Sequence, residues 1–235
     1  MDAPLHTARV CFEGRLADFR PGPLTPEGHY RFSGHPTIKD AIEALGVPHV
    51  EAGTLLVNGT GARFSDPLQP GHELQVFPDD APLPAPRFVL DVHLGSLARA
   101  LRLLGFDCLY ENDYSDPQIA AIAAAEQRAV LTRDIGLLKH GKVRWGYWLR
   151  SQHSEEQLAE VIGRYRLQDA IAPFRRCLSC NGAIAAVAEA DVRALIPPRV
   201  LGFQKEYFQC AHCGKVYWKG THYQRMKAFI ERVSK

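Results

Sequence analysis

Residues 88–107 read FVLDVHLGSLARALRLLGFD, a stretch that predicts a strand, a helix and a second strand in succession. Its first apolar run is typical of a short buried strand and ends at Asp91. Leucine and alanine then recur at helical spacing until Gly105, a residue type that commonly ends helices. The second apolar run begins at Phe106 and predicts the next strand.

The alternation of strand and helix continues after this stretch. We expect a helix opened by Asp116-Pro117, a strand at 129–132, a short helix to Leu138, a strand at 142–148 and a helix opened by a capping box at 154–157. Strands that alternate with helices indicate an α/β fold with a mostly parallel sheet and helices on both faces. This sheet domain is predicted to span residues 87–172.

A different pattern precedes it, in residues 1–78. Strands are expected at 7–12, 28–32, 54–57 and 73–77. Thr37 and Asp40 predict a capping box before a helix that Gly46 ends, and Asn58-Gly59 predicts a turn. Two strands, a helix and two more strands look like a ubiquitin-like β-grasp domain of the α+β class.

A proline-rich segment separates the two patterns. Four prolines fall in the nine residues from Pro78 to Pro86, where they remove backbone donors and stiffen the chain. We therefore assign residues 79–86 to a linker.

The last segment, residues 173–235, carries four cysteines in two C-x-x-C pairs, Cys177/Cys180 and Cys210/Cys213. Two residues between thiolates allow both sulfurs to bind one tetrahedral zinc ion. Asn181-Gly182 and Gly214 follow the pairs and can adopt the left-handed backbone of a tight knuckle. Redox cysteines or chance spacing are the alternatives. The pattern indicates a zinc ribbon with structural zinc and an insertion in the 29-residue arm between the pairs.

The composition is that of an ordinary soluble protein, with 46% hydrophobic and 23% charged residues. Residues 1–14 lack the features of a signal peptide, and the apolar run at 119–125 is too short to cross a bilayer, so no membrane association is expected. Cys11 and Cys108 lie in strand-like runs and are expected to be buried thiols. Free thiols beside metal-binding cysteines favour a cytoplasmic location.

The net charge of +2 hides a gradient along the chain. Residues 1–86 carry 6 Lys and Arg against 11 Asp and Glu, a net of −5, and residues 87–172 balance. Residues 173–235 carry 11 against 4, a net of +7. A basic C-terminal segment favours a polyanion partner, with a solvated lysine-rich surface as the alternative.

Three aspartates are expected at one edge of the sheet. Asp91 ends the first strand, Asp116 opens the helix after the second, and Asp134 follows the third. Ligands collect outside the carboxyl ends of the strands in such sheets, and carboxylates suit Mg²⁺ or Mn²⁺. These ions activate water and stabilise charge on a phosphate. Helix capping is the alternative role for each aspartate, and Asp107 is expected to orient backbone.

The ordered set of motifs resembles a known family. The run 88–107, Ser115-Asp116, Leu131–Asp134 and the two cysteine pairs are similar to the Mut-seven C-terminal RNase domains, a PIN-like group with an appended zinc ribbon. The resemblance covers residues 87–225. The preceding β-grasp segment resembles the ubiquitin-like domain that often accompanies this family.

The resemblance implies metal-dependent cleavage of RNA. Asp91, Asp116 and Asp134 would hold the catalytic Mg²⁺ or Mn²⁺. Glu155 and Asp113 are weaker candidates for the fourth acid that many PIN nucleases contain, which leaves one or two ions open. RNA is the expected partner, with tRNA or another structured RNA as candidate substrates.

Basic and aromatic side chains are the candidates for RNA binding. Arg133 and Lys139 flank the third aspartate and could hold a substrate phosphate, or they could simply be solvated. In the ribbon, Lys215, Trp218 and Lys219 belong to a stretch in which aromatic residues alternate with cations, a pattern suited to stacking on bases. These aromatic residues could instead form the core of the ribbon.

We therefore expect an endoribonuclease, with a non-catalytic RNA-binding or adaptor protein as the alternative. The β-grasp domain lacks the free Gly-Gly tail that modifier proteins need, because the chain continues past residue 78. It is expected instead to recruit a protein partner or to pack against the nuclease domain. Its acidic charge also allows a hypothesis of autoinhibition, in which it occupies the basic ribbon.

Overall fold

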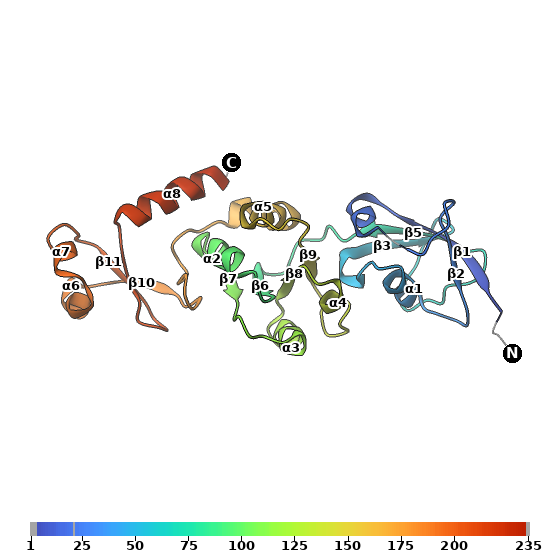
Figure 1. The fold of residues 1–235 in the computed structure, drawn as a ribbon, viewed down its shortest axis with the longest axis horizontal. Coiled ribbons are helices and arrows are strands. Elements are labelled where there is room, and N and C mark those ends of the chain that lie inside the picture. The colour runs from blue at the N-terminus through green and yellow to red at the C-terminus, as the bar shows by residue number, and fades with distance from the viewer. Residues whose placement is uncertain (1–3, 21, 234–235) are drawn as a thin grey trace. The chain divides into compact units, whose positions relative to one another are not determined.

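The structure is a computed structural model that describes residues 4–20 and 22–233 (Figure 1). Two compact units are present. The N-terminal unit combines Met1–Leu83 with Asp116–Trp148, and the C-terminal unit combines Pro84–Ser115 with Leu149–Lys235. Each unit is described by itself below.

The first part of the N-terminal unit has the β-grasp architecture that the sequence predicts. Its five strands are β1 (His6–Phe12), β2 (His29–Phe32), β3 (Ala52–Val57), β4 (Thr60–Gly61) and β5 (Glu73–Pro78), arranged in the order β2-β1-β5-β3-β4. The first and last strands pair in parallel, and the other pairs are antiparallel. Two short 3-10 helices, η1 (Gly14–Phe19) and η2 (His49–Glu51), complete this part.

Helix α1 (Ile38–Ala44) packs its apolar face into the β-grasp core, and its buried face includes Ile38, Ala41 and Ile42. The predicted capping box is confirmed. Thr37 Oγ1 accepts a hydrogen bond from the backbone N–H of Asp40 at 3.2 Å, and Asp40 Oδ2 accepts one from the backbone N–H of Thr37 at 3.0 Å. These two bonds satisfy backbone donors that a helix start leaves open.

The middle of the chain forms a four-stranded sheet in the order β7-β6-β8-β9. Its strands are β6 (Arg87–Leu90), β7 (Asp107–Leu109), β8 (Ala129–Thr132) and β9 (Gly146–Trp148). The pairs β6–β7 and β8–β9 are parallel, and all four residues of β8 are buried. This confirms the predicted parallel sheet, although β9 begins at Gly146, four residues later than expected.

Four helices accompany these strands: α2 (Gly95–Leu103), α3 (Asp116–Glu126), α4 (Ile135–Leu138) and α5 (Ser154–Tyr165). Within their own units, α2 packs on β7 and α5, and α3 and α4 pack on β8. The predicted helical stripe of α2 is confirmed, since Leu94, Leu97, Ala98, Leu101 and Leu104 are all buried. Gly105 ends this helix with φ +96°, a backbone angle that glycine tolerates best.

The capping box predicted for α5 is wrong. His153 occupies the N-cap position and makes no side-chain capping bond, and Ser154 is already helical. Gln157 Nε2 instead donates to the carbonyl oxygen of Ser151 at 3.0 Å, so its amide is engaged with the preceding loop. Glu160 holds the same loop by accepting from the backbone N–H of Ser151 at 2.9 Å.

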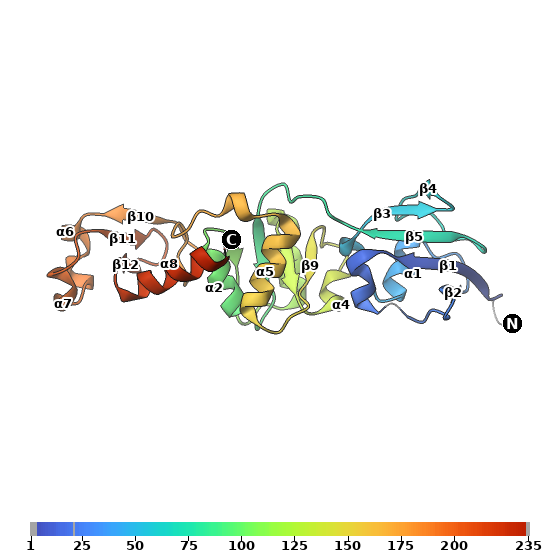
Figure 2. The same ribbon diagram turned by 90° about the horizontal axis from the view of Figure 1, so that it is seen from above.

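The end of the C-terminal unit is a three-stranded antiparallel ribbon in the order β10-β11-β12 (Figure 2). The strands are β10 (Ile184–Val187), β11 (Tyr207–Cys210) and β12 (Val216–Trp218), and η3 (Gln168–Ala170) precedes them. The long arm between the cysteine pairs holds α6 (Glu189–Val192), η4 (Arg193–Leu195) and α7 (Pro198–Leu201). This insertion has its own small core around Val192, Ile196 and Tyr207. Helix α8 (Thr221–Val233) then runs back toward α2 and α5, and Arg232 pairs with Glu155 at 2.8 Å (Figures 1 and 2).

The two cysteines outside the pairs differ in environment. Cys108 is buried, as predicted, but Cys11 is exposed, so the prediction of a buried thiol is wrong there. Strand β1 buries alternate residues, including Ala8 and Val10, and this alternation places Cys11 on the opposite face. None of the helices within residues 4–20 and 22–233 combines the length and the apolar character that crossing a membrane requires.

The β-grasp part packs against the segment 116–148 inside the N-terminal unit. Glu51 has a fully buried side chain whose Oε1 accepts from the backbone N–H of Trp148 at 2.6 Å. The Trp148 ring lies 4.7 Å from the ring of Phe19. This contact agrees with the expectation that the β-grasp domain packs against the nuclease segment. An ion pair between Arg15 and Asp80 also holds the start of the linker against the β-grasp part.

Candidate functional site

Asp91 lies at the carboxyl end of β6, in the C-terminal unit. Its side chain is half-buried, and Oδ1 accepts a hydrogen bond from the backbone N–H of Val92 at 2.7 Å. The chain then turns at His93 (φ +71°) into α2, whose N-cap position is Leu94 rather than Asp91. Helix capping therefore does not explain Asp91, whose carboxylate lies at the sheet edge where the ligands of α/β sheets collect.

The other two predicted acids belong to the N-terminal unit. Asp116 is the first residue of α3 and is exposed. Asp134 is the N-cap of α4, where Oδ1 accepts from the backbone N–H of Gly136 at 2.7 Å. Within the described residues, Asp134 Oδ2 has no hydrogen-bond or ion-pair partner. Asp134 thus caps a helix with one oxygen and presents the other, and the convergence of all three aspartates stays a prediction.

The weaker candidates for a fourth acid differ in how far they are engaged. Both carboxylate oxygens of Glu155 accept from Arg232 Nη2, at 2.8 and 2.9 Å. Asp113 is exposed in the turn after β7. Glu155 would have to give up this ion pair with Arg232 before it could bind a metal ion.

The two basic residues beside Asp134 have different surroundings. Lys139 is half-buried, and its ammonium donates to the carbonyl oxygen of Glu43 at 2.5 Å in the same unit. Arg133 is exposed, its carbonyl oxygen accepts from Trp148 Nε1 at 3.2 Å, and its guanidinium has no partner in the described part of the chain. Of the two, Arg133 is therefore the better phosphate-binding candidate.

The four paired cysteines form a compact cluster whose Sγ atoms all lie within 4.8 Å of one another. The Cys177–Cys213 and Cys180–Cys210 sulfur distances are 3.6 and 3.4 Å. Sulfurs bound tetrahedrally to zinc at about 2.3 Å lie about 3.8 Å apart, so the cluster fits a zinc ion closely. With four protein sulfurs, no coordination position remains open for chemistry.

The knuckle residues behave as the sequence predicts. Asn181 and Gly214 both adopt the left-handed backbone, with φ of +66° and +72°. Gly182 has no room for a side chain, since a Cβ there would lie 2.8 Å from Cys210 Sγ. The zinc cluster therefore depends on these three residues for its backbone path.

The first knuckle is attached to the sheet of the same unit through Asn181. Its Nδ2 donates to Asp107 Oδ1 at 2.7 Å, and its Oδ1 accepts from the backbone N–H of Cys108 at 2.9 Å. Asp107 was expected to orient backbone, and that role stays a prediction. It binds the side chain of Asn181 and also faces Arg176 at 3.4 Å.

Arg102 provides a second attachment. Its side chain is buried beneath the knuckle, where Nε donates to the carbonyl oxygen of Cys108 at 3.0 Å. Nη1 donates to the carbonyl oxygen of Ser179 at 3.1 Å, inside the knuckle itself. Arg102 thus joins α2, β7 and the ribbon.

Hydrogen bonds and burial shift the pKa values of two cysteines of the cluster. Burial raises the pKa of Cys177, but hydrogen bonds from Tyr217 and from backbone N–H groups outweigh burial and lower it to about 6. Burial raises the pKa of Cys180 to about 12, and hydrogen bonds within the cluster add to this. The hydrogen bonds at Cys177 therefore favour its thiolate, the form in which cysteine binds zinc.

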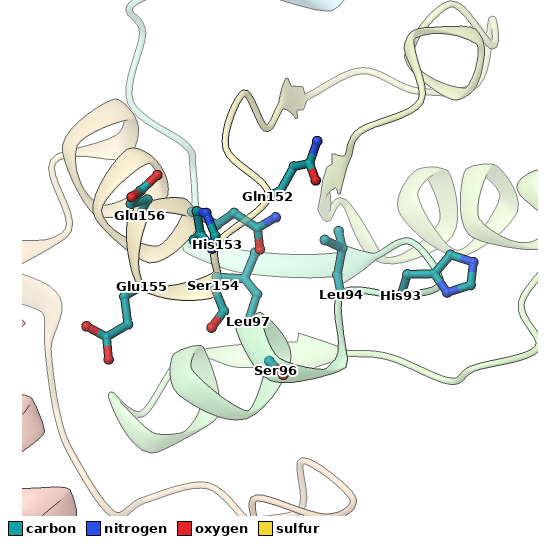
Figure 3. A pocket seen from close by; sticks show the side chains of 10 residues that line it. His93, Leu94, Ser96, Leu97, Gln152, His153, Ser154, Glu155 and Glu156 are labelled. Carbon is teal, nitrogen blue, oxygen red and sulfur yellow. The ribbon is translucent and has the colours of Figure 1, made fainter.

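A polar cavity of about 590 Å³ lies between the start of α2 and the start of α5 (Figure 3). Figure 3 shows Ser96 and Leu97 on α2 facing His153 and Ser154 at the start of α5. His93 also lines this cavity, and it is only two residues beyond Asp91. His93 and Ser96 line a second cavity of about 530 Å³ as well, which extends to the ribbon.

A larger groove of about 1010 Å³ runs between α2, the ribbon and α8. Arg99, Arg199 and Arg225 line it and are exposed, and none of them has an ion-pair partner in the described residues. Lys215 also lines it, and its ammonium lies 3.0 Å from Ser179 Oγ. We call this the arginine groove, defined by these four cations.

Two of the three ribbon residues that the sequence predicts to bind RNA line this groove. Lys215 and Trp218 line it, whereas Lys219 pairs with Glu206 at 2.5 Å. Tyr207 is a buried core residue, which confirms the structural alternative for that aromatic side chain. Arg99 was missed because it lies on the exposed face of α2, where only the helical period marks it as facing away from the leucine stripe.

Two protein-family models match this chain. The Mut7-C RNAse domain matches residues 86–230. This chain belongs to the Mut7-C RNAse domain family. The Mut7-C ubiquitin domain matches residues 5–83, which contain the β-grasp sheet. Searches of curated proteins and of solved structures found no match.

Membership in the Mut7-C family confirms the resemblance that the motifs indicated. It also indicates a nuclease-type function on RNA. The order of a Mut7-C ubiquitin domain, a Mut7-C RNase domain and a four-cysteine cluster within the latter agrees with the predicted architecture.

Proposed function

We propose that this protein is a metal-dependent endoribonuclease that cleaves phosphodiester bonds in RNA. The observation that carries the proposal is the Mut7-C RNase match over residues 86–230, in which Asp91 directly follows β6 in the same unit as the arginine groove. Cavities that share His93 and Ser96 lead from the Asp91 turn toward that groove. A phosphate backbone lying along the groove would thus reach the neighbourhood of Asp91.

Asp91, Asp116 and Asp134 would hold Mg²⁺ or Mn²⁺. The donor chemistry fits these ions, which prefer oxygen ligands, and Asp134 Oδ2 is available for one. When bound, such an ion activates water and neutralises charge that develops on the phosphate. The hydrogen bond from Gly136 orients the Asp134 carboxylate, and the unpaired arginines bind and orient the RNA backbone.

Zinc has a separate role in this proposal. The four-sulfur cluster holds the ribbon against α2 and β7 through Asn181 and Arg102, which keeps the cations of the ribbon beside Arg99. Zinc therefore supports RNA binding without taking part in the chemistry.

The test is incubation of the purified full chain with a mixed RNA pool, with and without added Mn²⁺ or Mg²⁺, followed by product analysis. Asp134→Asn should abolish cleavage, and asparagine keeps the helix cap because its side-chain oxygen also accepts from backbone N–H groups. Asp169→Asn removes the same charge from an exposed residue of η3 and should leave cleavage intact. Cleavage that survives in pure Asp134→Asn protein would reject the assignment.

A non-catalytic RNA-binding or adaptor protein is the second candidate. The observation in its favour is that Asp134 caps α4 and Lys139 binds the β-grasp part, so both have structural tasks. This alternative predicts RNA affinity that falls steeply with salt and no metal-dependent product.

Further features of the proposal concern partners and location. The β-grasp domain is proposed as a site for a protein partner, in addition to its contacts with residues 116–148. A tRNA or another structured RNA stays the predicted substrate.

Inhibition by the acidic β-grasp domain stays a hypothesis. Unchanged RNA affinity and cleavage after deletion of residues 1–80 would remove it. Reduced cysteines beside a zinc cluster favour the cytoplasm.

A further inference from the structure

A small apolar cavity of about 190 Å³ lies in the C-terminal unit where the ribbon meets α8 and the end of α2. We call it the aromatic cavity. Six of the residues that line it are Phe174, Leu178, Tyr217, Trp218, Tyr223 and Met226. The last five also line the arginine groove, so the cavity adjoins it.

The cavity has the size and walls that suit one flat ring system. Pockets for whole small molecules usually measure about 300–1,000 Å³, which is more than this cavity provides. The rings of Phe174 and Tyr223 form one wall with centroids 4.7 Å apart and planes inclined by 31°. Aromatic walls favour an aromatic guest because its faces and edges can stack on them.

Two features indicate that the cavity is more than a packing defect. Phe174 adopts φ +64°, which is uncommon for a bulky residue, and its backbone N–H donates to the carbonyl oxygen of Leu103 at 3.1 Å. Trp218 is half-buried, and its indole N–H has no acceptor in the part of the chain that the structure describes. Trp218 lines both the cavity and the arginine groove, so this donor belongs to the wall that the two share.

The surrounding charge identifies the class of guest. Arg199, Arg225 and Lys215 line the adjoining groove, and the two arginines have no ion-pair partner in the described residues. A guest that combines one flat ring with a chain of negative charges matches both features. Single-stranded RNA has this combination, since its unstacked bases can turn away from the phosphates.

We propose that the aromatic cavity binds one unstacked base of single-stranded RNA while the flanking phosphates lie along the arginine groove. This rests on the proposed function, because it takes RNA as the ligand. The cavity accepts a base through stacking on its aromatic walls, so it discriminates paired from unpaired RNA more strongly than one base from another. The ribbon thus selects unpaired segments for the nuclease domain.

The test compares two fluorescent ligands of equal charge by anisotropy: an unstructured ten-nucleotide RNA and a ten-unit ribose-phosphate chain without bases. The zinc-loaded full chain is used without added Mg²⁺ or Mn²⁺, so that binding is measured apart from cleavage. Wild-type protein should bind the RNA at least fivefold more tightly than the abasic chain.

Three variants locate the effect. Met226→Trp fills the cavity and should remove the preference for bases while leaving affinity for the abasic chain unchanged. Arg225→Gln should weaken both ligands by the same factor. Phe203→Leu changes an aromatic residue of the ribbon that is 84% exposed and lies outside the cavity lining, so it should alter neither affinity.

Zinc content and the thermal midpoint establish that each variant is folded, and Tyr223→Leu provides a second change of the cavity wall. Equal affinity of wild-type protein for the two ligands would overturn the proposal, as would a preference that Met226→Trp and Tyr223→Leu both retain. A base preference without any cleavage under added metal would support the cavity and reject the nuclease. Cleavage without a base preference would support the nuclease and reject base binding by the cavity.

Discussion

Replacing Asn181 by alanine should detach the first zinc knuckle from β7. Asn181 is 6% exposed, and alanine would remove both the acceptor for the backbone N–H of Cys108 and the donor to Asp107. Leaving the buried Cys108 donor without a partner costs about 1–3 kcal/mol. Asp107 would keep Arg176 and Arg87 within 3.6 Å, so its carboxylate adds little to this loss.

The backbone of Asn181 adds a second contribution. Its φ is +66°, a conformation that asparagine tolerates but that costs most other L-residues about 1–2 kcal/mol. The two contributions together destabilise the folded state by roughly 3 kcal/mol, which for a chain of this size lowers the thermal midpoint by roughly 6–12 °C. Asn181→Gly loses the same hydrogen bonds without the backbone strain, so its midpoint should fall less.

The assay is thermal unfolding of zinc-loaded protein, together with the rate at which a colorimetric chelator removes zinc. Asn112→Ala is the matched control, since this asparagine is exposed in the turn after β7. An Asn181→Ala midpoint within about 1 °C of wild type would refute the attachment of the knuckle through this side chain. Equal midpoints for the alanine and glycine variants would refute the contribution of backbone strain.

Three further predictions concern other parts of the molecule. Gly105→Ala would place a Cβ 2.0 Å from the carbonyl oxygen of Ala172, at a residue whose φ is +96°. Calorimetry should therefore show a loss of unfolding free energy above about 2 kcal/mol. Gly141→Ala is the control, because a Cβ there has no neighbour within 4 Å, and it should change the stability by less than about 1 kcal/mol. Glu51→Gln removes the charge of a fully buried side chain that pairs with the partly exposed Arg15 at 3.4 Å, and should lower the stability of the N-terminal unit by about 1–3 kcal/mol. Hydrogen exchange of the β-grasp strands measures this loss, and wild-type protection would contradict it. Burial lowers the pKa of His49, so the unfolded state binds its proton more readily and stability falls as pH drops below about 6.5. His49→Gln should flatten that part of the stability profile, and an unchanged acid slope would exclude His49 as its origin.

Residues far apart in sequence line the arginine groove, so the proposed RNA-binding surface extends beyond the ribbon residues that the sequence predicted. Arg99 belongs to α2, Arg199 to the inserted α7 and Arg225 to α8. No local motif unites them, and two of the cations predicted from sequence, Lys139 and Lys219, are engaged with other groups. The proposed RNA-binding surface is therefore shared between the helices of the RNase domain and the zinc ribbon.

The capping boxes show where sequence reasoning succeeds and where it fails. Thr37 and Asp40 exchange bonds within four residues, so local chemistry alone decides the outcome. The same pattern at 154–157 fails because Ser151, in the preceding loop, offers Gln157 a better partner. The burial of Cys11 was predicted wrongly because alternation along a strand tells which residues share a face but not which face is buried.

The amino-acid sequence by itself determined the main elements of the β-grasp and sheet domains and the four cysteines of the predicted zinc site. The leucine period of α2, the apolar run of β6 and the two C-x-x-C pairs each act over a few residues, where helical period, strand burial and thiolate spacing suffice. Tertiary structure alone decided that Asn181 and Arg102 bind the knuckle to β7 and that three distant arginines line one groove. The knuckle contacts join residues 73 and 77 positions apart, and the three arginines come from different helices of the unit. Only packing of the whole unit brings such residues together.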